Sequence, residues 1–281
     1  MAPGEGPFVM TSPTTDMHEA VNVAGEAAHA ASSGGHEGGI HVILKAEELW
    51  NVAGLPITNS LLMTWVVVFL LILFAFFFRR SLSLIPGKLQ AGIEMLFEGV
   101  LNYMGETLEN EKLARRFFPL VMTIFLFVFV ANELAFLPGI GSLLVDGTPL
   151  LRPPSADLNM TLALAVISFL TIEITGVAVL GFFKYAGKYV NFRSPVDFAV
   201  GIIELISNIG RLVSFSFRLF GNVFAGEVMI VVAMFFAAYL LPIPLIAFEM
   251  FVGFIQAVVF AMLTLFFIKL AIMEPHGEEA H

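Results

Sequence analysis

Long apolar runs separated by short polar stretches occupy most of the chain after residue 60. About twenty helical residues cross the apolar core of a bilayer, because each residue adds about 1.5 Å. The first three runs therefore predict one membrane-spanning helix each. The five runs cover residues 61–78, 117–137, 158–183, 196–241 and 244–272.

The last two runs predict a pair of unusually long helices. The run 196–241 is about twice the length that one crossing needs. It predicts a helix that tilts steeply, lies along the membrane or breaks. Only Leu241-Pro242-Ile243-Pro244 separates it from the run 244–272. Proline ends one helix and is tolerated in the first turn of the next, so we expect an antiparallel hairpin of two long, tilted helices.

Two further segments have patterns of their own. Between residues 86 and 110, apolar side chains recur at three- and four-residue steps, with charged residues off the stripe. This pattern predicts an amphipathic helix lying in the membrane interface.

Residues 1–40 are rich in Ala, Gly, Ser and His without apolar periodicity, which indicates a mobile tail before a membrane domain at 41–281. Residues 42–52 are expected to form a short surface helix before Pro56.

Composition supports the same class of protein. Hydrophobic residues make up 58% of the 281 residues and charged residues 13%, against about 45–50% and about 25% in soluble domains. The expected fold is therefore all-α and polytopic, with about five membrane helices plus the interfacial helix. The chain has no cysteine, which excludes disulfides, thiolate metal sites and cysteine nucleophiles. We expect no metal site, no cofactor and no nucleic-acid partner.

The basic residues predict the orientation. If the N-terminus is outside and the chain crosses five times, only Lys45 and Arg152 lie outside. Cytoplasmic loops carry an excess of Lys and Arg, so the N-terminus is predicted outside and the C-terminus in the cytoplasm. The basic residues then placed inside are Arg79, Arg80, Lys88, Lys112, Arg115, Arg116, Lys184, Lys188, Arg193 and Lys269.

Charged residues within the fourth run are the main candidates for function. Glu204, Arg211 and Arg218 are spaced by seven residues and so form one helical stripe, with Ser207 and Asn222 near the same face. A charge at the bilayer centre costs at least ~2.5–3.5 kcal/mol and usually lines a pathway or contacts a partner. The stripe therefore indicates an ion path or a binding surface.

The fifth run adds a second polar stripe. Glu249 and Gln256 are also seven residues apart. In a folded hairpin, the pairs 227/249 and 218/256 have nearly the same midpoint, so one register is predicted to bring Glu227 to Glu249 and Arg218 to Gln256. Acids on both sides of a permanent cation can exchange protons with water, whereas arginine cannot release its own proton.

Less specific interpretations stay open for several of these residues. Arg211 snorkels or pairs with Glu204, or else takes part in conduction. Glu227 and Glu249 form a structural pair that shares a proton, or else carry protons. Glu173 lies singly in its run, where a helix-end contact explains it as well as a function does. Asp157 most simply caps the third span.

The segment Phe217-Arg218-Leu219-Phe220-Gly221-Asn222, continued by Ala225-Gly226-Glu227, resembles the signature of subunit a of F-type ATP synthases. Other segments over residues 55–273 resemble the same family in the same order, among them Asn132, Pro154-Ser155-Ala156-Asp157 and Gln256. Many relatives combine one histidine and one acid at the positions of Glu227 and Glu249, whereas this chain has two acids.

The resemblance implies a proton-conducting stator subunit without its own catalytic site. It implies that Arg218 is the essential arginine facing the carboxylates of a rotating ring of c subunits, with Arg211 secondary. It implies an outer half-channel and an inner one, and two long helices nearly parallel to the membrane against the ring. The outer half-channel would contain Asn222, Glu227, Glu249 and Gln256, and the inner one Glu204 and Ser207.

Further expectations follow from the same resemblance. The partners would be the c-ring, the b subunits of the peripheral stalk, membrane lipid and protons, in a bacterial inner membrane. A sodium-translocating version is the closest alternative, because the ring carboxylate that selects the ion is on another chain. A secondary transporter or self-contained channel is disfavoured, since the chain has no inverted repeat and no pair of Gly/Pro-broken segments. A purely structural assembly subunit leaves the charges in the membrane unexplained.

Overall fold

The structure is a computed structural model of the whole chain. Everything below concerns the unit Val42–His281. The predicted tail, the residues after Ile272 and the proposed helix at 42–47 lie outside the described residues. The structure describes residues 48–52, 55–83, 86–137, 144–145, 148–189, 195–237 and 240–272.

Helices dominate the described residues, and five of them are long and apolar enough to cross a membrane. Each of these five overlaps one predicted span, which confirms the all-α polytopic fold. The predicted fourth run, 196–241, is too long at its end: an unbroken helix of 42 residues covers Pro195–Phe236, and the next helix begins at Pro242. The helices are α2 (Asn59–Ser81), α3 (Lys88–Leu108), α4 (Glu111–Ala135), α5 (Leu158–Leu180), α6 (Phe182–Tyr189), α7 (Pro195–Phe236) and α8 (Pro242–Ile272).

The predicted surface helix at 42–52 is wrong for its described part. Residues Glu48–Val52 form strand β1, which pairs antiparallel with β2 (Leu55–Thr58). Trp50 and Val52 favour strands over helices. Pro56 is tolerated in β2 because a two-stranded sheet consists of edge strands. A second, shorter pair joins β3 (Leu144–Val145) to β4 (Thr148–Pro149).

The predicted third span, 158–183, is too long. Helix α5 ends at Leu180 because Gly181 adopts a φ of 83°, a left-handed value that glycine takes without strain. The chain then starts α6, a short helix that the apolar pattern had not separated from the span. The predicted cap is confirmed, since Asp157 Oδ1 accepts a hydrogen bond from the Asn159 N–H at 2.9 Å.

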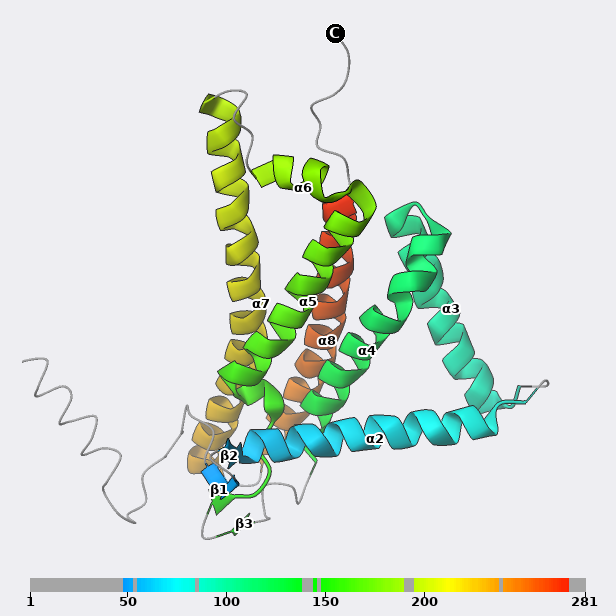
Figure 1. Cartoon of the computed structure of the whole chain (residues 1–281). Helices are drawn as coiled ribbons and strands as arrows, with labels where there is room; N and C mark the ends of the chain where they lie inside the picture. Colours follow the sequence, from blue (N-terminus) through cyan, green and yellow to red (C-terminus); the bar gives the residue numbers. More distant parts are fainter. Residues whose placement is uncertain are drawn as a thin grey trace, which may run out of the picture. The chain divides into compact units, whose positions relative to one another are not determined.

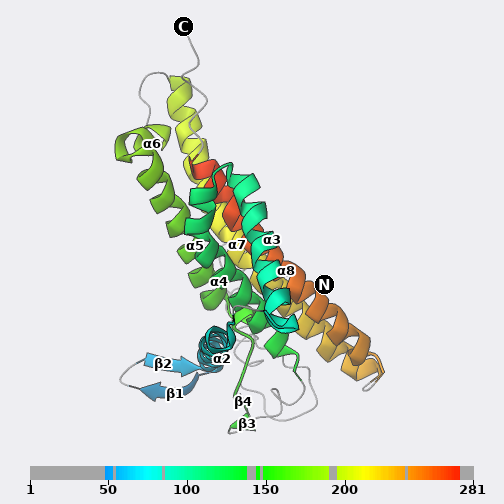
Figure 2. The same cartoon turned by 90° about the vertical axis from the view of Figure 1, so that its right-hand side faces the viewer.

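Helices α4, α5, α7 and α8 run side by side, whereas α2 runs crosswise to them at one end (Figures 1 and 2). Helix α2 is buried only through its first turns, where Met63 and Val67 have no exposed surface. The large side chains beyond them, such as Phe69 and Phe77, are mostly exposed. The amphipathic helix α3 is confirmed as a helix, and it packs along α4 with the rings of Phe97 and Phe118 5.8 Å apart.

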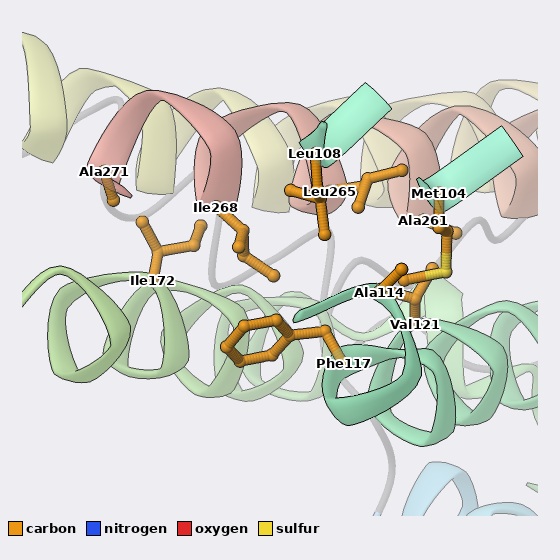
Figure 3. Packing of buried hydrophobic residues seen from close by; sticks show 10 residues of the cluster. All are labelled: Met104, Leu108, Ala114, Phe117, Val121, Ile172, Ala261, Leu265, Ile268 and Ala271. Carbon is orange, nitrogen blue, oxygen red and sulfur yellow. The ribbon is translucent and has the colours of Figure 1, made fainter. Parts of the chain in front are cut away.

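Two apolar clusters hold the four parallel and antiparallel helices together. One joins α3, α4, α5 and α8 through side chains that interlock between the helices (Figure 3). The other joins α4, α5, α7 and α8, and in it the ring of Phe215 stacks on that of Phe260 at 4.9 Å. The first cluster contains Met104, Leu108, Ala114, Phe117, Val121, Ile172, Ala261, Leu265, Ile268 and Ala271.

Buried polar contacts fix the other end of the bundle. Asn132 on α4 donates a hydrogen bond to the Gly253 carbonyl at 3.2 Å and accepts one from Ser155 Oγ at 2.7 Å. Asp157 accepts a hydrogen bond from Ser60 Oγ at 2.6 Å, which ties the start of α2 to the start of α5. Three of these residues belong to the segments that carried the family resemblance, namely Asn132, Ser155 and Asp157. Their hydrogen bonds join separate helices and so stabilise the fold.

Candidate functional site

Helix α7 divides its charged residues between two faces. The face that packs on α5 and α8 carries buried residues such as Phe215, Leu219 and Val223. Arg218 lies on the opposite, exposed face, where its Nη2 donates to Ser214 Oγ at 3.5 Å. A Cβ added to Gly221 would meet nothing within 4 Å, so the surface beside Arg218 is open. The guanidinium is therefore presented to whatever covers α7 from outside the chain.

A carboxyl group lies between α7 and α8 on the other side of the hairpin. Glu249 on α8 is only 5% exposed. Its carboxyl group occupies the place where a side chain of Gly226 would be, because a Cβ built on Gly226 would overlap it. The absence of a side chain at Gly226 therefore lets α7 approach Glu249 closely.

Glu227, the next residue on α7, has an ion-pair partner from a connecting segment. Arg152, just before the 3₁₀ turn Pro154–Ala156, places Nη2 3.6 Å from Glu227 Oε2. The two side chains are 12% and 25% exposed. Within the described residues, no hydrogen bond joins Glu227 to Glu249, so the structure gives no support to a directly bonded acid pair.

The predicted register of the hairpin is confirmed by these contacts. Gly226 meets Glu249 and Phe215 meets Phe260, so both pairs share a midpoint close to residue 238. This register places Gln256, which is half-buried, at the level of Arg218. Asn222 is also half-buried, and its Nδ2 has no hydrogen-bond partner among the described residues. A buried donor without a partner is rare and favours a bound water or ion path.

The other end of α7 carries the predicted inner residues. Glu204 is half-buried and Ser207 is exposed. The guanidinium of Arg211 lies over the ring of Phe267 on α8, 4.8 Å from its centre. Such a cation–π contact stabilises a cation where water is scarce.

Beside these residues lies a polar cluster built from three helices. The Glu173 carboxylate on α5 accepts hydrogen bonds from Tyr185 at 3.0 Å and from Tyr189 at 3.3 Å, both on α6. Asn208 on α7 donates to Glu173 Oε1 at 3.4 Å and to the Tyr189 hydroxyl at 2.5 Å. Burial, followed by the neighbouring tyrosine and Glu173, raises the pKa of Tyr185, and burial likewise raises that of Tyr189. Both phenols are therefore neutral donors to the carboxylate.

Residues 61–269 match the family described as ATP synthase A chain. The chain is 34% identical over 215 residues to ATP synthase subunit a 3 of Pelobacter propionicus, which covers 76% of this chain and 87% of that protein. The chain belongs to the ATP synthase A chain family. It is also 35% identical over 201 residues to ATP synthase subunit a of Campylobacter concisus, covering 70% and 82% of the two chains. With ATP synthase subunit a of Desulforamulus reducens, identity is 34% over 240 residues, covering 82% and 86%.

In this member of the ATP synthase A chain family, the predicted site residues form two separate groups along α7. Glu227 on α7, with Glu249 of α8 beside Gly226, lies toward one end of the helix, Glu204 and Arg211 lie toward the other, and Arg218 lies between them on the exposed face. Their roles in proton transfer stay predictions. In the part of the chain that the structure describes, no group of three or more His, Asp or Glu side chains could hold a metal ion.

Two parts of the site were missed by the sequence reasoning. Arg152 was counted only for orientation, although it was one of two basic residues placed outside and lies two residues before the motif at 154–157. Glu173 was treated as a single acid, and its partners on α6 were not considered. The four-residue spacing of Tyr185 and Tyr189 was the available signal, since it places both on one face of a helix.

Proposed function

We propose that this chain is the proton-translocating stator subunit a of an F-type ATP synthase. In this proposal two half-paths and one arginine couple proton flow to rotation of a c-ring, and the ATP chemistry is carried out by other subunits. The observation that carries the proposal is the exposed Arg218 on α7, between an outer group of acids and an inner one. A cation placed there, without a carboxylate partner among the residues that the structure describes, fits a site completed by another chain.

The directions of the helices support a long, flat surface for that partner. Helix α2 is long and apolar enough to cross a membrane and runs crosswise to α7 and α8 (Figure 1). If α2 crosses the bilayer, α7 and α8 lie close to the membrane plane, as does the amphipathic helix α3. Such an orientation explains how helices of 42 and 31 residues fit a membrane that about twenty residues would span.

The spacing along α7 suits two half-paths that do not meet. Arg218 is ~13 Å by helical rise from Glu227 and ~21 Å from Glu204. We assign Asn222, Glu227, Glu249 and Gln256 to the outer path, and Glu204 with Ser207 to the inner path. Arg152 adds a cation to the outer path, where it holds Glu227 in place.

Arginine between the paths has a specific electrostatic task. A ring carboxylate that has lost its proton must pass from one path to the other without protonation from the wrong side. A fixed guanidinium stabilises it in the charged form and offers two parallel donors. Because arginine stays protonated in proteins, it also blocks direct proton transfer between the half-paths.

The remaining assignments concern the partner subunits, the membrane and the orientation of the chain in it. We expect the c-ring to cover the exposed face of α7, and peripheral-stalk b subunits to bind elsewhere on the chain. We place the protein in a bacterial inner membrane with the N-terminus outside and the C-terminus in the cytoplasm, since ten of twelve assigned basic residues are then inside.

The test is to replace Arg218 and measure ATP synthesis driven by a proton gradient in vesicles that contain the purified complex. Arg218→Ala should abolish synthesis while leaving the complex assembled, because the side chain is exposed and supports no packing. Arg218→Lys should fail nearly as badly, since lysine can lose its proton in a dry site and lacks the planar donor pair. Near-normal synthesis with Arg218→Ala would refute the proposed function.

A further inference from the structure

The connection 148–157, which leads into α5, carries one charged side chain to the acids that we assign to the outer path. Arg152 places its Nη2 3.6 Å from Glu227 Oε2 on α7, and the two side chains are 12% and 25% exposed. Hydrogen bonds between nitrogen and oxygen usually measure about 2.7–3.2 Å, so this contact is an ion pair. Because the arginine side chain is long and flexible, its head group takes a defined place only if the backbone that carries it is fixed.

The backbone before Arg152 is attached to the start of α2. Three residues earlier, the Pro149 carbonyl accepts a hydrogen bond from Asn59 Nδ2 at 3.3 Å. Asn59 is the first residue of α2 and is only 1% exposed. A buried amide that loses its partner is costly. Asn59 therefore fixes this point of the connection.

The backbone after Arg152 is attached to α4 and, through α4, to α8. Three residues later, Ser155 Oγ donates a hydrogen bond to Asn132 Oδ1 at 2.7 Å. Asn132 Nδ2 in turn donates to the Gly253 carbonyl on α8 at 3.2 Å. Gly253 lies about one helical turn from Glu249. Arg152 thus stands between two fixed points, and one of them is tied to the helix that carries the second acid.

Two prolines directly after Arg152 restrict the backbone between these points. The ring of a proline fixes its φ near about −65°, and Pro153 has a φ of −51°. A residue that precedes a proline is restricted to extended conformations, which applies to Arg152 itself. The short 3₁₀ turn that follows contacts α2, α4, α5 and α7. The connection is therefore a rigid support for the guanidinium.

We propose that Arg152 is a positioning residue of the outer path, and that Asn59 and Ser155 fix the connection that carries it. The inference rests on the proposed function, in which Glu227 and Glu249 transfer protons on this path. Arg152 orients the Glu227 carboxylate toward the connection, while the Glu249 carboxyl group lies between α7 and α8. Both acids then have defined and separate places. These places matter because a misplacement of about 1 Å can slow a reaction about a hundredfold.

A purely structural role of Arg152 makes different predictions. If Arg152 only stabilised the connection, replacing it by lysine or by glutamine would have similar effects. If its charge orients Glu227, lysine should retain more activity than glutamine, because only lysine keeps the cation. A change at Asn59 should then act through Arg152, so its effect should disappear once the charge at Arg152 has been removed.

The first experiment uses the intact ATP synthase in vesicles, with synthesis driven by an imposed proton gradient. Arg152→Gln should lower the rate about tenfold, which is less than a full misplacement by 1 Å can cause. Arg152→Lys should lower it only about two- to threefold, because the ion pair survives with one donor group in place of two. Arg80→Gln is the matched control, since Arg80 lies at the other end of α2 over the ring of Phe76, and it should leave the rate unchanged.

The second experiment tests the anchor at the start of α2. Asn59→Ala should lower the rate about threefold in the wild type and cause no further loss in the Arg152→Gln background. Gln90→Ala is the matched control, because the buried Gln90 amide holds the connection after α2 by donating to the Ser83 carbonyl at 3.1 Å. Any loss with Gln90→Ala should be the same in both backgrounds.

Three results would overturn the inference. They are a wild-type rate for Arg152→Gln, equal rates for Arg152→Lys and Arg152→Gln, and an Asn59→Ala loss that is as large with Arg152→Gln as in the wild type. If Arg152→Gln does not assemble, Asn59→Ala decides alone, since it leaves both charged groups in place. A greater loss than with Gln90→Ala in an assembled complex then supports the inference, and a loss no greater than that overturns it.

The proposed function is tested separately in the same vesicles by Arg218→Ala. If Arg218→Ala abolishes synthesis but the Arg152 and Asn59 variants behave as a structural role predicts, only the further inference fails. If Arg218→Ala retains synthesis, the proposed function fails, whatever the result at Arg152.

Discussion

Gly226→Ala should impair proton-driven ATP synthesis without preventing assembly. The added methyl group would overlap the Glu249 carboxyl group, so either that group or the helix hairpin must move. The hairpin cannot separate easily, because Phe215 and Phe260 stack at 4.9 Å between the same two helices. The carboxyl group is at the end of a rotatable side chain and is therefore the part expected to shift.

The expected size of the effect follows from the cost of overpacking. Adding a methyl group to a packed site costs about 1–3 kcal/mol. If this cost falls on the proton-transfer geometry, the synthesis rate drops between about fivefold and about a hundredfold, since about 1.4 kcal/mol is a factor of ten. Shortening the acid should relieve the overlap, so Glu249→Asp should partly rescue Gly226→Ala.

The assay is ATP synthesis by the purified complex in vesicles under an imposed proton gradient. Gly99→Ala is the matched control, because a Cβ on Gly99 of α3 meets nothing within 4 Å. Alanine also suits a helix interior better than glycine, by roughly 0.5–1 kcal/mol. A wild-type rate for Gly226→Ala would contradict the reasoning and would show that the position of the Glu249 carboxyl group does not limit proton transfer.

Two further predictions test the orientation and the outer path. Cysteines introduced at residues 20 and 278 should react with impermeant reagents from opposite sides of the membrane, and labelling of both from one side would exclude five crossings. Glu249→His should support more proton-driven synthesis than Glu249→Leu, because histidine can bind and release a proton and leucine cannot. Equal rates in these two variants would indicate that Glu249 has a structural role.

Much of the hairpin could be predicted from the sequence because its polar residues follow helical spacing. The seven-residue steps from Glu204 to Arg218 and from Glu249 to Gln256 placed each set on one face, and the prolines indicated a hairpin, although the first helix ends at Phe236 and both prolines lie in the first turn of α8. Together these gave a register that the Gly226 and Phe260 contacts confirm. Local periodicity was sufficient here because both partners are long helices joined directly.

The rest of the site could not be predicted because it depends on contacts between distant segments. Arg152 comes from an irregular connection, where no periodicity indicates the direction of a side chain, yet it pairs with Glu227. Glu173 appeared isolated because its donors lie on other helices, Tyr185 and Tyr189 on α6 and Asn208 on α7. Tertiary packing, made possible by Gly176 and Gly201, brings these groups together.

The charges within the membrane helices differ in how the chain itself accommodates them. Glu227 has Arg152, Glu249 is enclosed beside Gly226, and Arg211 lies on the ring of Phe267. Arg218 has the contact with Ser214 and an otherwise open surface. Because an unpaired cation in a membrane is costly, the function we propose stabilises Arg218 through a carboxylate on another chain. A carboxylate supplied by a moving partner would also let the interaction be made and broken in turn.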